Sequence, residues 1–177
     1  VVETVNAAFT EGKAMTGMEG GLILCTLRHY TEEQSMETVR LVEQFKGTNV
    51  LAFDMAGDEA GYPVAAHVKA FEFAKAHQLH CTCHAGEAKG PESVWDVLGH
   101  LHPTRIGHGV RSAEDPALLD HLIKKDIHLE VCPTSNVQTN IFPSVKEHNV
   151  NKIYRHGVSM SINTDARTVT PVTLSSE

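Results

Sequence analysis

The chain has 177 residues, of which 41% are hydrophobic and 21% are charged, a composition that allows one sizeable core in a globular protein. Its formal charge of −7 argues against non-specific binding to nucleic acid or to an anionic membrane. No apolar run approaches the roughly 18 residues of a membrane span. We therefore expect a cytoplasmic protein with neither kind of partner.

The first part of the chain alternates helical and strand patterns. Residues 1–17 carry apolar side chains at helical spacing and finish at Gly17, a residue type that commonly ends helices. Residues 21–27 are a continuous apolar run, which predicts a strand buried on both faces. Thr31 and Gln34 have the form of a capping box and predict a helix over 31–45, and a second strand is expected over 50–54.

The same alternation continues to the end of the chain. Helices are expected over 64–76, 91–98, 115–125 and 143–148, and strands over 80–85, 105–107, 127–132 and 159–163. Strands that alternate with helices at this spacing predict βα units and a parallel sheet.

Polar residues follow several of these strands and favour one parallel architecture over another. The residues at predicted strand ends are Arg28, His29, Asp54, His84, His108, Glu130 and Asp165. A (β/α)8 barrel collects polar groups at the carboxyl ends of its strands, whereas the G-x-G-x-x-G sequence of a doubly wound sheet is absent. The strands number fewer than eight. We therefore expect an α/β fold, a partial TIM barrel covering roughly the third to the eighth strand, as one domain over residues 1–177 that is truncated at both ends.

The four cysteines, Cys25, Cys81, Cys83 and Cys132, all fall in apolar runs, where a reduced cysteine behaves as a small hydrophobic residue. Cys81 and Cys83 are two positions apart on a predicted strand, so their side chains point to opposite faces and are poorly placed to form a disulfide. Cysteines used in this way are typical of a reducing compartment. An apolar strand also raises a thiol pKa, which disfavours Cys132 as a nucleophile.

His84 and Glu87 are the first candidate site residues. Ala85 and Gly86 separate them, and two small residues allow a sharp turn that could direct both side chains into one cavity beside a bound ion. The alternatives are a hydrogen-bonded structural histidine and a solvated loop carboxylate.

His108 and Asp165 are further candidates at later strand ends. Glycines on both sides of His108 allow close backbone approach and unusual dihedral angles, although a structural Gly-His-Gly turn is equally compatible with this pattern. Asp165 could be a ligand for a divalent ion, or it could cap a following helix. Asp54 and Glu130 have the placement of carboxylates that orient neighbouring histidines.

Several other chemistries are excluded by spacing. The sequence has no H-E-x-x-H, no G-x-S-x-G and no phosphate-binding P-loop. The zinc deaminases that act on nucleic-acid bases need H-x-E with P-C-x-x-C, whereas here the cysteines form C-x-C.

Five motifs taken together resemble the adenosine deaminase family in order and spacing: M-A-G-D-E (55–59), C-H-A-G-E (83–87), I-G-H-G (106–109), C-P-T-S-N (132–136) and S-I-N-T-D (161–165). The resemblance covers nearly the whole chain. It implies hydrolytic deamination of adenosine and deoxyadenosine to inosine and ammonia, a purine nucleoside as the partner, and one zinc ion per active site.

The resemblance also implies roles for individual residues. His84 and Asp165 would be zinc ligands, and Glu87 would protonate the purine at N1 as water attacks C6. His108 would orient the attacking water and help to deprotonate it. Gly57 would provide a backbone contact to the purine.

Two departures from the family pattern affect these expectations. The H-x-H pair that supplies two more zinc ligands on the family's first strand is absent, so we expect the isolated chain to bind zinc weakly and to catalyse poorly. Ala166 stands where many members of the family have a second aspartate that contacts the purine. Adenine deaminase, an adenine-nucleotide deaminase and a non-catalytic barrel relative therefore stay open as alternatives.

Overall fold

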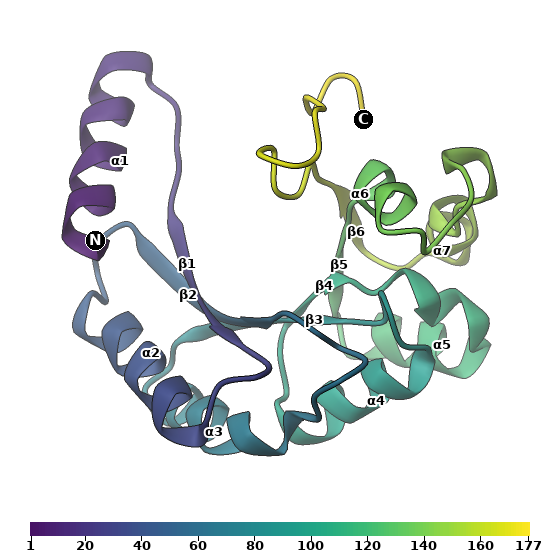
Figure 1. Ribbon diagram of the computed structural model, residues 1–177, viewed down its shortest axis with the longest axis horizontal. Helices are drawn as coiled ribbons and strands as arrows, with labels where there is room; N and C mark the ends of the chain where they lie inside the picture. The colour runs from purple at the N-terminus through teal and green to yellow at the C-terminus, as the bar shows by residue number, and fades with distance from the viewer.

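A single parallel sheet organises the molecule (Figure 1). The computed structural model describes residues 1–177 and contains six strands that pair in chain order. They are β1 (Leu22–Leu27), β2 (Val50–Ala56), β3 (His80–Ala85), β4 (Arg105–His108), β5 (His128–Val131) and β6 (Met160–Ile162). Every neighbouring pair is parallel, which confirms the predicted α/β partial-barrel architecture.

The helices α2 to α5 each follow a strand and lie on the outer side of the curved sheet (Figure 1). The α-helices are α1 (Val2–Thr16), α2 (Glu32–Gln44), α3 (Val68–Ala76), α4 (Pro91–His100), α5 (Pro116–Lys124), α6 (Pro133–Gln138) and α7 (Val150–His156). Short 3₁₀ helices complete the fold: η1 (Val64–His67), η2 (Val110–Glu114) and η3 (Val145–Glu147). None of the helices is long and apolar enough to cross a membrane.

Local sequence signals explain several of these boundaries. The Thr31 hydroxyl accepts a hydrogen bond from the Gln34 backbone N–H, and the Gln34 side chain accepts one from the Thr31 N–H, so the predicted capping box begins α2. Gly17 ends α1 at φ 70°, a left-handed conformation that suits glycine. These short-range contacts could be predicted because all the interacting atoms lie within one turn.

The core lies between the sheet and α2–α5. Phe53 on β2 and Phe71 on α3 meet with ring centroids 4.9 Å apart, and both side chains are at most 2% exposed. Ile106 on β4 and Leu122 on α5 are fully buried in the same cluster. This packing fixes the strands from the outside and leaves their carboxyl ends available to form a site.

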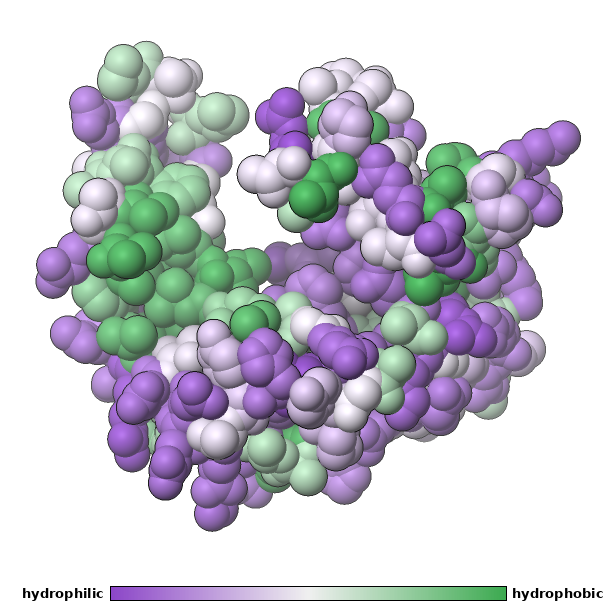
Figure 2. Space-filling view, viewed as in Figure 1, coloured by the Kyte–Doolittle hydropathy of each residue, from purple (hydrophilic) through white to green (hydrophobic).

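The first strand is less buried than its apolar sequence predicts. β1 pairs only with β2 and ends the sheet at one edge, Ile23 is 39% exposed, and Cys25 is also exposed. The prediction of burial on both faces is therefore wrong for β1, because no element covers one of its faces. Figure 2 shows a mostly hydrophobic surface over this arm of the molecule and an open notch between it and the arm that carries the C-terminal segment.

The region after β5 also differs from the sequence prediction. The helix expected over 143–148 is only the three-residue turn η3, and the flanking helices α6 and α7 were not expected. α6 has the sequence P-T-S-N-V-Q, whose serine, threonine and asparagine residues are weak helix formers. For α7 the signal was present in Gly157, which ends the helix at φ 94°.

Buried polar side chains hold the end of β3 in place. The Arg28 guanidinium is 3% exposed and donates to the backbone carbonyl of His84 at 2.9 Å and to that of Tyr62 at 3.1 Å. The His67 ring is fully buried between the Ser35 hydroxyl at 2.6 Å and the Arg28 carbonyl at 3.1 Å. His67 is thus a structural histidine that supports the residue contacting His84.

Candidate active site

Three of the predicted site residues meet at the carboxyl edge of the sheet. Glu87 lies two residues after β3, His108 is the last residue of β4, and Asp165 lies three residues after β6. The His108 Nε2 atom is 3.5 Å from Glu87 Oε2 and 3.8 Å from Asp165 Oδ2. The His108 side chain is only 4% exposed, whereas both carboxylates are partly exposed. A buried imidazole thus faces two carboxylates that solvent or a ligand can reach.

His84 lies beside this group and is oriented by a buried carboxylate. Its Nδ1 atom is 3.2 Å and 3.0 Å from the two oxygens of Asp54, and its ring meets that of His108 edge-on with centroids 5.3 Å apart. Burial alone would raise the pKa of Asp54, but hydrogen bonds from His84 and from the Met55 backbone bring it below its usual value. Asp54 is therefore an ionised acceptor that holds Nδ1 of His84 and leaves Nε2 on the opposite side of the ring.

The charge of Asp54 also acts on the protonation of His84. Burial by itself lowers the pKa of His84, but the hydrogen bond and the negative charge of Asp54 raise it to about 9. Asp165 and Glu87 act in the same direction. The three carboxylates thus favour the protonated ring, and a metal ion that binds Nε2 would have to displace a proton.

The loop that carries Glu87 is held by another buried carboxylate. Glu59 is 5% exposed and accepts hydrogen bonds from four consecutive backbone N–H groups: Gly86 at 2.5 Å, Glu87 at 3.1 Å, Ala88 at 2.6 Å and Lys89 at 2.9 Å. Gly86 takes φ +68°, and an added Cβ there would lie 2.5 Å from the Val94 side chain. Only glycine fits the turn that aims these N–H groups at Glu59.

Backbone strain concentrates in the same place. His108 and Asp165 adopt φ +61° and +57°, and Gly109 continues the left-handed conformation at φ +64°. Residues other than glycine rarely adopt these backbone angles, and those that do are concentrated at functional sites. A Cβ at Gly107 would lie 2.9 Å from the His84 ring, so glycine at this position gives His84 the space to pack against β4. The glycines around His108 thus allow the close approach and the unusual dihedral angles that were predicted.

Asn136 links the two central residues. Its side-chain nitrogen donates to Glu87 Oε1 at 3.0 Å and lies 3.1 Å from His108 Nδ1, and the residue is fully buried. His148 Nε2 lies 3.2 Å from Asn136 Oδ1. On the other side of the site, the Ser135 hydroxyl donates to Asp165 Oδ2 at 2.7 Å. α6 therefore supplies two consecutive side chains that fix the acid, the imidazole and the aspartate.

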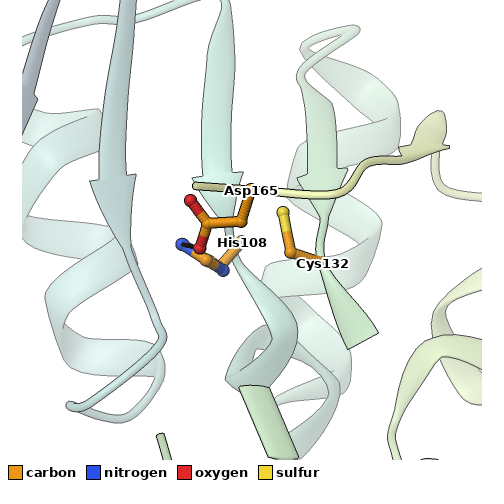
Figure 3. A group of neighbouring side chains, drawn as sticks. All are labelled: His108, Cys132 and Asp165. Atoms are coloured by element: carbon orange, nitrogen blue, oxygen red, sulfur yellow. Dashed lines mark ion pairs between the residues drawn. The ribbon is translucent and has the colours of Figure 1, made fainter. Parts of the chain in front are cut away.

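Two sets of residues could provide ligands to a metal ion. The possible ligand atoms of His108, Cys132 and Asp165 lie within 4.8 Å of one another (Figure 3). Burial raises the pKa of the Cys132 thiol to about 12, with the charges of Asp165 and Glu87 adding to the effect, and a neutral thiol is a poor metal ligand. His84 and Asp165 form the better set, because Asp54 binds Nδ1 of His84 and leaves Nε2 free.

The sequence prediction and the structure differ for some residues. His84, Glu87, His108 and Asp165 come together as expected, and Asp165 caps no helix, since only a turn follows it. Glu130 is bound by Arg105 at 2.6 Å and by Thr82 at 3.1 Å, so its expected contact with a histidine is wrong. Gly57 is exposed after β2 at φ +105°, and its expected contact with a purine stays a prediction.

Sequence reasoning missed three contributors to the site: Glu59, Asn136 and His148. Glu59 and Asn136 lie within the quoted motifs M-A-G-D-E and C-P-T-S-N, which could have drawn attention to them. His148 lies outside every motif, and no sequence signal connected it with the site.

A buried imidazole that faces two carboxylates at the carboxyl edge of a parallel sheet is the arrangement expected of a hydrolytic enzyme built on a (β/α) barrel. The family model that matches the sequence, over residues 1–177, is adenosine deaminase. The chain therefore belongs to the adenosine deaminase family.

Curated relatives carry two different activity names. A protein of Klebsiella pneumoniae (strain 342) named adenosine deaminase is 41% identical over 165 residues, which are 93% of this chain and 49% of the relative. A protein of Bordetella parapertussis named adenine deaminase is 38% identical over 165 residues, which are 93% of this chain and 52% of the relative. The chain spans about half the length of these relatives.

Solved structures of similar proteins share the fold. Adenine deaminase from Arthrobacter aurescens has a TM-score of 0.85 at 25% identity, over 93% of this chain and 50% of that one. The N6-methyl-AMP deaminase from Arabidopsis thaliana has a TM-score of 0.79 at 29% identity, over 88% and 45% of the two chains. An amidohydrolase from Burkholderia ambifaria, solved with bound zinc, has a TM-score of 0.86 at 23% identity, over 95% and 47%.

Proposed function

We propose that the protein removes the exocyclic amine of a purine by hydrolysis, and that adenosine and deoxyadenosine are its substrates. The products would be inosine or deoxyinosine, and ammonia. The observation that carries the proposal is the convergence of the Glu87 and Asp165 carboxylates within 3.8 Å of Nε2 of His108 in a chain of this family.

Each of these side chains has a task in the proposed reaction. Glu87, whose position Asn136 fixes, would deliver a proton to the purine ring nitrogen N1. His108 would orient the water that attacks C6. The exposed backbone of Gly57, at the same edge of the sheet, would contact the purine.

His84 and Asp165 would hold one zinc ion. This donor set fits the metal, because a carboxylate orients the histidine and a hydroxyl anchors the aspartate. When bound, zinc supplies the Lewis acidity that makes water nucleophilic near neutral pH. The contacts that orient each ligand, from Asp54 to His84 and from Ser135 to Asp165, are both present in the chain.

The identity of the purine is the finer part of the proposal. The relatives named adenosine deaminase and adenine deaminase are similarly close to this chain, at 41% and 38% identity. Ala166 has no polar side-chain atom that could bind the base or distinguish one purine from another. Preference among adenine, adenosine and AMP must then come from contacts to the sugar and the phosphate.

A substrate panel tests this proposal. The full-length protein, loaded with zinc, is incubated with adenosine, deoxyadenosine, adenine and AMP, and loss of the amine is followed by the change in ultraviolet absorbance. We expect kcat/KM to be highest for the two nucleosides. A preference for adenine or for AMP would assign one of the related activities instead, and no turnover of any of the four would contradict the proposal.

A further inference from the structure

The N-terminus of α7 fixes the protonation of one histidine. The backbone N–H of Val150 belongs to the first turn of α7 and has no partner within the helix. It donates to His148 Nδ1 at 2.9 Å. Because a backbone N–H can only donate, Nδ1 of His148 must be the acceptor, and the proton of the neutral ring lies on Nε2.

This proton determines which way the Asn136 amide points. His148 Nε2 lies 3.2 Å from Asn136 Oδ1 and donates to it. On the opposite side, Asn136 Nδ2 lies 3.0 Å from the Glu87 carboxylate oxygen Oε1. If the amide were flipped, its NH₂ group would face the N–H of His148, and its oxygen would face the carboxylate oxygen of Glu87. Both contacts would be repulsive, so both neighbours select the same orientation.

The amide in turn determines the tautomer of His108. One hydrogen of Asn136 Nδ2 goes to Glu87, and the other points at His108 Nδ1, 3.1 Å away. Nδ1 of His108 therefore accepts, and the proton of the neutral ring is on Nε2, which faces Glu87 at 3.5 Å and Asp165 at 3.8 Å. Because Nδ1 faces a donor it carries no proton, so the hydrogen bond from Asn136 itself selects the neutral ring.

We infer that His148 and Asn136 are positioning residues that hold His108 as the Nε2–H tautomer, a hydrogen-bond donor toward the substrate pocket. In this tautomer Nε2 has no lone pair, so His108 neither binds a metal ion nor takes a proton at that atom. His108 would orient the attacking water by donating to it, and a carboxylate would be the acceptor for the proton of the water. The catalytic role of this tautomer rests on the proposed function, whereas the assignment of the tautomer rests only on the hydrogen bonds.

Nuclear magnetic resonance tests the tautomer directly. In the chain labelled with ¹⁵N-histidine, long-range ¹H–¹⁵N correlations show which ring nitrogen of His108 carries hydrogen, and His108→Gln assigns the signal. We expect hydrogen on Nε2 of both His108 and His148 at pH 7. Hydrogen on Nδ1 of His108 would overturn the inference, whatever the protein deaminates.

Variants test whether His148 is the cause. His148→Phe keeps an aromatic ring against Phe142, whose ring centroid lies 4.4 Å from that of His148, but removes the donor to Asn136. We expect a mixture of His108 tautomers in His148→Phe and restoration of the single tautomer in His148→Gln, which retains an N–H donor. An unchanged His108 signal in folded His148→Phe would contradict the role of His148. If that variant does not fold, Asn136→Ala provides the same comparison one step closer to His108.

A kinetic measurement connects the tautomer with catalysis. In the full-length, zinc-loaded protein, we expect His148→Phe to lower kcat for adenosine about tenfold with little change in KM, and His148→Gln to restore it. In His148→Phe, a retained His108 tautomer with low activity would contradict the role of His148 in setting the tautomer. An altered tautomer with full activity would contradict the role of the tautomer in catalysis. Neither result depends on whether the proposed function fails.

Discussion

The carboxylate of Glu59 accepts the backbone N–H of Glu87 at 3.1 Å, together with the N–H groups of the residues on both sides. A buried acid thus determines the position of the acid proposed to act on the substrate. The contact joins residues 28 positions apart and ties the end of β2 to the end of β3. Precise placement of a proton donor requires support of this kind.

Replacing Glu59 by glutamine should loosen this loop. Glutamine keeps one acceptor oxygen but places an NH₂ group among backbone donors, so at least one N–H becomes unpaired. We expect the free energy of unfolding to fall by about 2 kcal/mol, measured by urea titration. Glu114→Gln is the matched control, because Glu114 is partly exposed and pairs only with Arg111. Equal stability of Glu59→Gln and the wild type would contradict this account of the loop.

Asp54→Asn should weaken zinc binding. The amide no longer provides a charged acceptor for Nδ1 of His84, and loss of such a partner typically costs about 10- to 100-fold in metal affinity. Competition with a chromophoric chelator measures the affinity in the full-length protein. Glu130→Gln is the control, since this strand-end carboxylate binds Arg105 and touches no histidine. An Asp54→Asn affinity within about twofold of wild type would rule out the orienting role.

Gly107→Ala tests the packing of the His84 ring. The new Cβ would lie 2.9 Å to 3.1 Å from three atoms of that ring, which would have to move. We expect weaker zinc binding and a loss of stability of about 1–3 kcal/mol, seen as a lower urea midpoint. Gly99→Ala in α4 is the matched control, because an added Cβ there meets nothing within 4 Å and alanine favours the helix. Normal zinc affinity in Gly107→Ala would show that the ring position is not critical.

Cys132→Ala distinguishes the two possible ligand sets. Burial raises the pKa of the thiol to about 12, so at neutral pH it is protonated and presents no thiolate. We expect zinc affinity at pH 7 to change less than threefold in Cys132→Ala. A loss of a hundredfold or more would instead make Cys132 a ligand together with His108 and Asp165.

Short-range features of the fold could be predicted from the sequence. The capping box at Thr31 and the end of α1 at Gly17 depend only on neighbouring residues, and both are confirmed. The exposure of Ile23 on β1 could not be predicted. An apolar sequence indicates that a strand tends to be buried, but it does not show which face of the strand other elements cover. α6 was missed because its composition resembles that of a loop.

The candidate site divides in the same way. Strand-end placement and short spacing identified His84, Glu87, His108 and Asp165, since residues at the carboxyl ends of parallel strands share one edge. Glu59 and His148 act through contacts 28 and 12 residues away in the chain, and a single sequence does not specify which distant atoms meet. Glu130 was wrongly grouped with Asp54 because both lie near the carboxyl end of a strand, but Arg105 binds Glu130 instead.

The most direct test of the central claim is kcat for adenosine in the full-length, zinc-loaded Glu87→Gln variant. Glutamine keeps the shape and the contact with Asn136 but has no proton to deliver as an acid. We predict a fall in kcat of about 10²- to 10⁴-fold with a nearly unchanged KM, while Glu92→Gln in the first turn of α4 retains wild-type kcat. A Glu87→Gln enzyme within threefold of wild type would contradict the proposed active site.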